Sequence, residues 1–437
     1  MSVFLSAGAA CSDITPRQSV FLFGYPHTER MSTGVHDPLL CSALYLGDHD
    51  GGLLFISLDV IYVDKALVLG TRQQIHRQTG IREDSILIAA THTHSGPVTV
   101  DCLCTADDAV VPDADTGYRH FLVDSMIRTA VKAISSAKPA VAGLVFADSR
   151  GIGSNRHDPA REINHQVPVL LIRDRKKQKN IACLLVVNIH PTVLHQDSRL
   201  ISADFPGMAR AEMQRTLGAE CAVVYYTGPC GNTSPRHMTR SNTFAEARRL
   251  GTLLAESVIG AVKKSDFTGQ LNLATRQTFI DLPPRPMMAT DEAKSRLSHR
   301  QKRLQDLINA AADSREIRTA ECDLYGAEET LTLSRAAAEE KLDAVVRTCL
   351  PAEIQVFTIG DWNFIGWPGE IFVEYALSVQ QKHANAFVIS LANGELQGYI
   401  VTAAEAERGG YEASNALFDH RSGLILVRET LALLNKI

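Results

Sequence analysis

Short apolar runs bounded by glycine, proline or charged residues recur along the chain and alternate with longer amphipathic stretches. The run at 86–90 is typical of a buried strand, because it is short and uninterrupted. Helices are predicted at 65–79 and 243–264, and the second begins with a capping box of Thr243 and Glu246. The pattern predicts an α/β protein with mixed central β-sheets flanked by helices.

Several strands are predicted to pair as hairpins around polar turns. The stretches 39–58, 167–189 and 354–365 each hold two apolar runs separated by a turn that contains glycine or charged residues. A (β/α)8 barrel would instead show a regular alternation of strand and helix. The hairpins therefore argue against a barrel.

The clearest internal break is the proline-rich segment 283–286, which precedes a charged helical region. Residues 288–348 are predicted to form two or three amphipathic helices. We interpret them as a helical insertion within one catalytic domain that spans 1–437. A partner-binding coiled coil is the alternative, but its apolar seam is short and interrupted.

Composition excludes some classes of function. The 437 residues carry a net charge of -5, so there is no basic footprint for nucleic acid. No apolar run approaches the roughly 20 residues needed to span a bilayer. The N-terminus lacks a basic region and is interpreted as a first strand rather than a signal peptide. The nine scattered cysteines favour reduced thiols in a cytoplasmic protein, and the oligomeric state is left open, a homo-oligomer included.

Candidate chemistry begins with the sequence THTHSGP at 91–97, into which the strand that begins at 86–90 is predicted to continue until Gly96 and Pro97 end it. Because side chains alternate along a strand, His92 and His94 are predicted to point the same way. Two such imidazoles suit a divalent metal of the zinc type, or one metal ligand beside a catalytic acid/base. The alternative is a pair of hydrogen-bonded core histidines.

Three further residues follow predicted strands in the same manner, each next to a glycine or proline: His190, Ser234 and Glu370. A sheet that gathers its strand ends at one edge would bring these side chains to His92. Two histidines and one glutamate are a ligand set of catalytic zinc that leaves a position for water. Zinc would lower the pKa of that water to ~7.

The order of short motifs along nearly the whole chain resembles the neutral/alkaline (non-lysosomal) ceramidase family. The motifs are THTHSGP at 91–97, NR at 155–156, HPT at 190–192, GNTSP at 231–235, PGE at 368–370 and GYIVT at 398–402. DITP at 13–16, GVH at 34–36, ISAD at 201–204 and YE at 411–412 fit the same string. The resemblance implies a neutral-ceramidase-like catalytic domain and a role in sphingolipid metabolism.

The resemblance implies that Zn²⁺ is held by His92, His190, Glu370 and Tyr399. It also implies a metal-dependent amidohydrolase acting on a linear N-acyl amide through an activated water. The substrate partner would be a small-molecule or lipid-like amide. Tyr399 is a ligand that residue types alone do not indicate.

The other candidate site residues take their roles from the same resemblance. His94 would bind and polarise the substrate rather than the metal, and it can pass a proton to the leaving amine. Arg156, Ser234 and Tyr411 would line the active site. Ser234 would anchor a substrate hydroxyl or act as nucleophile, and we favour the anchor because no histidine is adjacent in sequence.

The chain departs from the family pattern at the serine motif, where Asn232 and Thr233 precede Ser234 and Arg236 follows Pro235. The family usually has Asp and Val before the serine and Asn after the proline. Arg236 would place a positive charge beside the pocket. We also expect no C-terminal β-sandwich domain. These departures leave two alternatives to a ceramidase: a hydrolase of small polar or anionic amides, lactams or esters, and a non-catalytic lipid-binding homologue.

Overall fold

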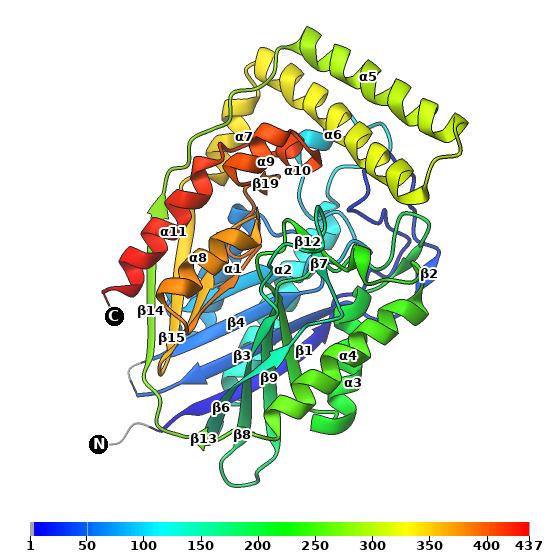
Figure 1. The fold of residues 1–437 in the computed structure, drawn as a ribbon. Coiled ribbons are helices and arrows are strands. Elements are labelled where there is room, and N and C mark those ends of the chain that lie inside the picture. The colour runs from blue at the N-terminus through cyan, green and yellow to red at the C-terminus, as the bar shows by residue number, and fades with distance from the viewer. Residues whose placement is uncertain (1–3, 50, 437) are drawn as a thin grey trace.

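The computed structural model describes residues 4–49 and 51–436, and two β-sheets form its centre (Figure 1). The larger sheet has the strand order β11-β9-β8-β6-β1-β3-β4-β5, with β13 beside β6, and the smaller has the order β14-β15-β16-β18. The strands of the larger sheet are β1 (Ser6–Asp13), β3 (Leu40–Gly47), β4 (Gly52–Leu58), β5 (Ile86–Ala90), β6 (Lys138–Asp148), β8 (Gln166–Asp174), β9 (Asn180–Val187), β11 (Ala222–Thr227) and β13 (Phe267–Thr268). Those of the smaller sheet are β14 (Leu273–Ile280), β15 (Ala352–Ile359), β16 (Trp362–Gly366) and β18 (Ala386–Ile389).

Both sheets combine parallel and antiparallel pairs, so the predicted mixed α/β class is confirmed. β4 is parallel to β5, β9 to β11 and β16 to β18. The two halves of the larger sheet are joined where Ser6 and Ala7 of β1 pair with β6. The two halves also face each other. A hydrogen bond joins them directly, in which the Ser57 hydroxyl of β4 donates to the Tyr225 carbonyl oxygen of β11 at 2.5 Å.

The core between the sheets is aromatic. The Phe55 ring meets Phe357 and Phe364 of the smaller sheet edge-on, with ring centroids 5.0 and 5.8 Å apart. Tyr226 from the other half of the larger sheet lies 6.3 Å from the same ring. One buried cluster thus joins both halves of the larger sheet to the smaller sheet.

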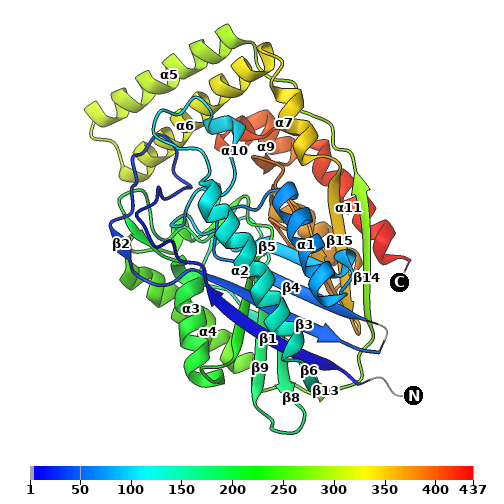
Figure 2. The same cartoon turned by 180° about the vertical axis from the view of Figure 1, so that it is seen from behind.

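Helices cover the outer faces of the sheets. Two pack on the half that contains β1, β3 and β4, as Figure 2 shows, and two pack on the half that contains β8 and β9. Two more cover the smaller sheet. The pair on β1, β3 and β4 is α1 (Lys65–Thr79) and α2 (Thr116–Ser135). The pair on β8 and β9 is α3 (Asp204–Leu217) and α4 (Phe244–Val262). The pair on the smaller sheet is α8 (Val373–Lys382) and α11 (Arg421–Leu434).

Local sequence signals explain where these helices begin and end. The Asp64 side chain accepts a hydrogen bond from the Leu67 backbone N–H and starts α1. Gly80 ends this helix in the left-handed conformation, at φ 76°, which glycine adopts without strain. At the start of α4, the Thr243 side chain accepts from the Glu246 N–H, which is one half of the predicted capping box. The Glu246 side chain accepts instead from the Arg240 N–H, at 2.9 Å.

A helical layer, α5 (Thr290–Asn309), α6 (Ser314–Ala338) and α7 (Leu342–Cys349), crosses the top of Figure 1. It contacts the C-terminal helices α9 (Ala403–Arg408) and α10 (Tyr411–Asn415). Arg296 of α5 donates to the Ser414 hydroxyl at 2.6 Å, and Asn415 donates to Glu329 of α6 at 2.5 Å. These contacts support our proposal that the layer is an insertion within one domain.

Short strand pairs outside the two sheets position loops near the top of the sheets. They are β2 (Gly34–Val35) with β10 (Leu200–Ile201), β7 (Ser154–Asn155) with β12 (Thr233–Ser234), and β17 (Glu370–Ile371) with β19 (Tyr399–Ile400). Across 4–49 and 51–436, we find no helix whose length and apolar character would let it cross a membrane.

Candidate metal centre

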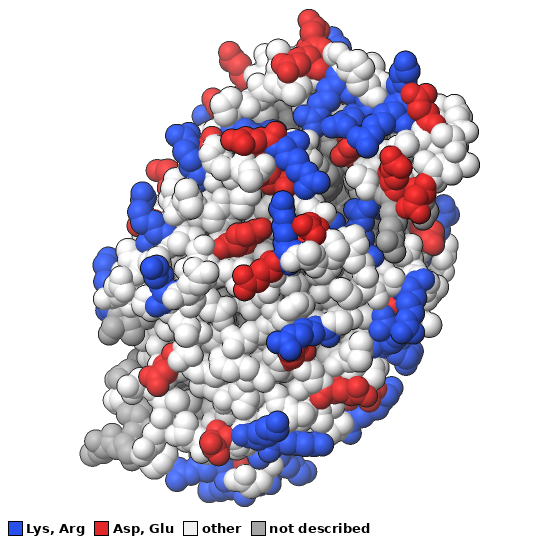
Figure 3. All heavy atoms as spheres, in the orientation of Figure 1, with Lys and Arg blue, Asp and Glu red and all other residues white. Residues whose placement is uncertain are grey.

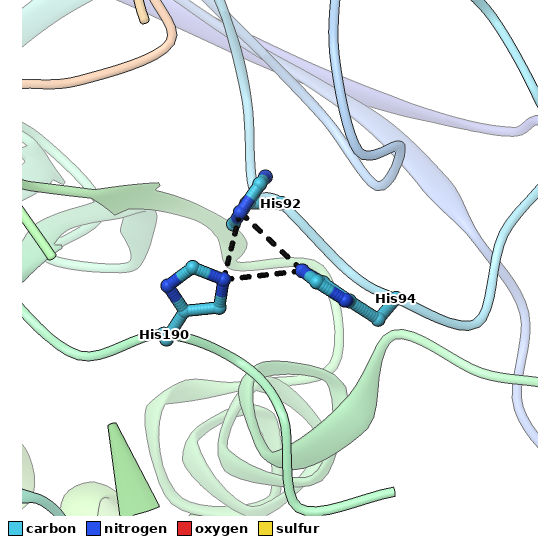
Figure 4. A group of neighbouring side chains, drawn as sticks. All are labelled: His92, His94 and His190. Atoms are coloured by element: carbon cyan, nitrogen blue, oxygen red, sulfur yellow. Dashed lines mark hydrogen bonds between the residues drawn. The ribbon is translucent and has the colours of Figure 1, made fainter. Parts of the chain in front are cut away.

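Three histidine side chains, two from one turn and one from a distant part of the chain, meet in the interior (Figure 4). The Nε2 atom of His92 lies 2.9 Å from Nε2 of His190 and 3.4 Å from Nε2 of His94. The Nε2 atoms of His94 and His190 are 3.1 Å apart. His92 and His190 are fully buried, whereas His94 retains 9% exposure. The three nitrogens therefore surround a single point.

The opposite nitrogen of each ring faces a backbone carbonyl oxygen. In the order His92, His94 and His190, the acceptors are Ile61, Gly24 and Cys230, at 3.0, 2.9 and 3.3 Å from Nδ1. We assign the proton of each neutral ring to Nδ1, because a carbonyl oxygen can only accept. Three Nε2 lone pairs then point at one another. A cation between them would remove this repulsion, so the residues present fit a metal ion.

Burial dominates the electrostatics of two of these rings. It lowers the pKa of His94 well below the usual value, and the neighbouring His92 lowers it further. Burial also lowers the pKa of His190 well below the usual value, and His92 lowers it further. Both rings are neutral at physiological pH as a result.

Glu370 supplies a carboxylate to the same point. Its Oε2 lies 3.2 Å from Nε2 of His92 and 3.7 Å from Nε2 of His190. Its Oε1 accepts a hydrogen bond from the Tyr62 hydroxyl at 2.6 Å. Burial raises the pKa of Glu370, but His92 and the Tyr62 hydrogen bond outweigh it and leave the pKa below the usual value. The side chain is therefore an ionised oxygen donor beside three nitrogen donors.

Tyr399 is set beside Glu370 by the pairing of two very short strands. β17 and β19 run parallel, and their register sets Glu370 opposite Tyr399. The Tyr399 ring lies below the Arg156 guanidinium, whose carbon is 5.3 Å from the ring centroid. Burial and the Glu370 charge raise the pKa of Tyr399 well above its usual value.

The predicted reason for the convergence of His92 and His94 is wrong. Strand β5 ends at Ala90, so neither histidine belongs to it. His92 has a φ of 69°, and its backbone N–H donates to the Val60 carbonyl oxygen at 2.9 Å. This left-handed turn, rather than the alternation of a strand, brings the two rings together.

A cavity of about 420 Å³ opens above the centre. Six of the eight predicted site residues line it: His94, Arg156, His190, Ser234, Tyr399 and Tyr411. Glu370 lines a smaller adjoining space of about 40 Å³, together with Tyr62. His92 lies beneath, in contact with Glu370 and His190. The structure thus brings all eight residues together, in a cavity of the size that suits a small ligand.

The β7–β12 pair holds Ser234 and Arg156 beside each other. Ser234 pairs with Ser154, and the Arg156 N–H donates to the Asn232 carbonyl oxygen at 2.8 Å. Glu412 holds the Arg156 guanidinium in an ion pair. Burial raises the pKa of Glu412, but Arg156 and His157 lower it to about 2, so this pair is charged.

Sequence reasoning missed two residues that orient the site. Tyr62 holds Glu370, and Glu412 holds Arg156. Tyr62 follows the apolar strand β4 as a polar aromatic residue, which was an available signal. Glu412 belongs to the YE motif but was given no role of its own.

A Tyr62→Phe variant is expected to bind a divalent metal ion roughly 10–100-fold more weakly, because Glu370 loses the donor that orients it. Competition against a chelator measures this affinity. Tyr118→Phe is the matched control, since the Tyr118 hydroxyl donates to the Ile14 carbonyl oxygen, away from the centre. Equal metal affinities in the two variants would show that Tyr62 does not support the site.

The fold and the buried histidine–glutamate cluster define an α/β protein with a candidate metal centre. Residues 5–224 match the family described as neutral/alkaline non-lysosomal ceramidase, N-terminal. The chain therefore belongs to the neutral/alkaline non-lysosomal ceramidase family, as its motifs predicted.

The chain is also similar to a curated protein in sequence and to two solved structures in fold. The neutral ceramidase of Oryza sativa subsp. japonica is 22% identical over 228 residues, a match that covers 47% of this chain but 28% of that protein. The crystal structure of the Pseudomonas aeruginosa neutral ceramidase has the same fold, with a TM-score of 0.75 at 18% identity over 100% of this chain and 75% of that one. A structure described as ceramidase complexed with C2 gives 0.76 at 17% identity, covering 100% and 76% of the two chains.

Proposed function

We propose that this chain is a zinc-dependent hydrolase that cleaves an N-acyl amide bond, as a ceramidase does. The observation that carries the proposal is the convergence of three imidazole Nε2 atoms and one carboxylate at the floor of a cavity. Family membership supplies the amide as the bond to be cleaved. A protein that only binds lipid has no need of such a buried donor set.

We assign the metal ion to His92, His190, Glu370 and Tyr399. When bound, zinc supplies an activated water and polarises an acyl carbonyl. His94 is assigned to the substrate, because it is the most exposed of the three histidines and lines the cavity. The distances leave a second assignment, in which His94 is the third imidazole ligand.

The remaining side chains act on the substrate. The reaction consumes one water, breaks the C–N bond and releases a carboxylic acid and an amine. Arg156 and Tyr411 line the cavity and can donate hydrogen bonds to the developing oxyanion, each worth typically ~3–4 kcal/mol. His94 can hold the proton that the leaving amine requires.

Ser234 is proposed to anchor the substrate rather than attack it. Its hydroxyl accepts a hydrogen bond from the Arg236 N–H at 3.4 Å. Within 4–49 and 51–436, no histidine forms a hydrogen bond with this hydroxyl. A serine nucleophile needs a base within hydrogen-bonding reach, so the anchoring role is favoured.

A cytoplasmic location also remains a proposal. All nine cysteines are free thiols, which agrees with a reducing compartment.

Chelation tests the proposed function directly. Metal-loaded protein is assayed on a fluorescent short-chain ceramide and on a panel of small N-acyl amino acids, cyclic amides and esters. We expect amide turnover to stop when a chelator removes the metal, and to return when one equivalent of zinc is added. Undiminished turnover by metal-free protein, together with an inactive Ser234→Ala variant, would replace the metal mechanism with a serine nucleophile.

A further inference from the structure

The cavity above the metal centre is rich in arginine, although the whole chain has a net charge of -5. Figure 3 shows Lys and Arg side chains gathered along the helical layer beside a hollow in this face. The arginines that line the cavity are Arg156, Arg236, Arg300, Arg303, Arg318 and Arg408. The carboxylates in the same lining are Asp323, Glu405 and Glu412. Cationic groups therefore outnumber anionic ones around the space where a substrate would bind.

Two arginines of the helical layer share one of these carboxylates. Arg300 and Arg303 of α5 both reach Asp323, at 3.1 and 3.5 Å. The carboxylates on the other side of the cavity also have charged partners of their own. Glu412 pairs with Arg156, and Glu405 lies 3.6 Å from Arg408. The three carboxylates of the lining are thus shared among six arginines, and Arg318 pairs with Glu321, which lies outside the lining.

Arg236 and Arg318 approach the cavity from different elements. Arg236 lies on a short turn, Pro235–His237, directly after Ser234, while Arg318 lies on α6. The Arg236 Nη2 donates to the Thr319 hydroxyl at 2.9 Å, and Arg318 pairs with Glu321 at 3.0 Å. Of these two guanidinium groups, one therefore comes from the body of the protein and the other from its helical layer.

The cavity concentrates positive charge around Cys322. Cys322 lines the cavity together with Arg156, Arg236 and Arg318. Burial raises the pKa of the Cys322 thiol, the three guanidinium groups act to lower it, and Glu412 acts to raise it. Burial lowers the pKa of Arg236. Arg156 and Arg318 act in the same direction, whereas Cys322 and Glu412 act to raise it. The Nη2 donor of Arg156 is buried without a hydrogen-bond partner among the described residues. Like charges held this close repel, and a bound anion would offset the repulsion.

We propose that the substrate is an amide that carries an anionic group, and that Arg236 and Arg318 bind this group while the acyl carbonyl faces the metal centre. The inference rests on the proposed amide hydrolysis. A guanidinium matches the geometry of a carboxylate or a phosphate with two parallel hydrogen bonds. A neutral amide carries no charge that would offset the charges of this pair.

Matched substrates that differ only in charge test the inference. N-hexanoylglycine is compared with N-hexanoylglycinamide for a carboxylate, and N-hexanoyl-O-phosphoethanolamine with N-hexanoylethanolamine for a phosphate. We expect the anionic member of at least one pair to have the higher kcat/KM. Arg236→Gln and Arg318→Gln should each lower that value roughly 10–100-fold, the loss of a charge-assisted hydrogen bond, and leave the neutral member nearly unchanged.

Controls separate this inference from the proposed function. Arg428→Gln removes an arginine that is exposed on α11 and should change neither substrate. Calorimetric binding of hexylphosphonate against hexanol tests the anion site without turnover. Equal turnover of charged and neutral amides by wild type and both variants would overturn the anion site and leave the amidase intact. Hexylphosphonate binding that Arg236→Gln weakens, without any amide turnover, would retain the anion site and refute the amidase.

Discussion

The His92→Ala variant is expected to lose its bound metal and its amide hydrolysis together. Removal of a residue that only hydrogen-bonds to a metal ligand typically lowers metal affinity or activity roughly 10–100-fold. Removal of a ligand itself should lower both by more than that. His92 is the fully buried ring whose Nε2 lies near both other Nε2 atoms and Glu370. Metal content per chain, measured by mass spectrometry, and kcat/KM on the best amide substrate give the two readouts.

Two other histidines of the cavity make the result specific. His195 lines the cavity but lies outside the Nε2 cluster. Burial, and to a smaller extent the charge of Arg318, lowers its pKa to about 4. His195→Ala should therefore keep its full metal content. His94→Ala should also keep the metal but lose turnover, if His94 contacts the substrate. Loss of metal from His94→Ala would make it the third imidazole ligand, and full metal in His92→Ala would refute the centre.

The largest effect on stability is expected at a buried ion pair. Arg72 of α1 donates to both oxygens of Glu353 in β15, at 2.7 and 3.1 Å, and both side chains are almost completely buried. Gln355 and Asn393 complete the network. Arg72→Met would leave the Glu353 carboxylate buried without its cation. The free energy of unfolding should therefore fall by about 3–5 kcal/mol.

Denaturant unfolding measures this loss against two references. Arg82→Met breaks an exposed pair with Asp84, in which the Arg82 side chain is 74% exposed, and should change the free energy of unfolding by less than about 1 kcal/mol. A double variant with Arg72→Met and Glu353→Leu should be more stable than Arg72→Met alone, since no unpaired charge remains. Equal losses for Arg72→Met and Arg82→Met would show that burial of the Arg72–Glu353 pair adds nothing.

Elements with a clear local pattern were predictable from the sequence. The helix at 65–79 has the predicted bounds, because apolar spacing and caps within the segment determine them. The apolar run 86–90 is a strand as predicted, but it ends at Ala90, before the histidines that it was expected to include. The hairpin of β15 and β16 turns at Gly360, as its sequence indicated. Each of these features depends on neighbours in the chain.

Features that depend on distant residues were not predictable in this way. Strands β17 and β19 have two residues each, which is too few for any periodicity, yet their pairing sets Tyr399 against Glu370. Only the family resemblance singled out Tyr399. The turn at His92 has no pattern of its own either, since its positive φ is stabilised by contacts with Val60 and Ile61. The place of Arg318 in the cavity depends on how α6 packs, which amphipathic spacing alone does not reveal.

The metal centre is divided between the two halves of the polypeptide. The segment that matches the family model, 5–224, carries His92 and His190, whereas Glu370 and Tyr399 come from the C-terminal part. Neither part alone contains a complete set of proposed ligands. Metal binding therefore depends on the assembly of both halves. A polypeptide that stops before β17, or whose C-terminal part is not packed against β5, would lack the oxygen donors and keep the imidazoles. The amount of bound metal would thus measure the docking of the two halves without a catalytic assay.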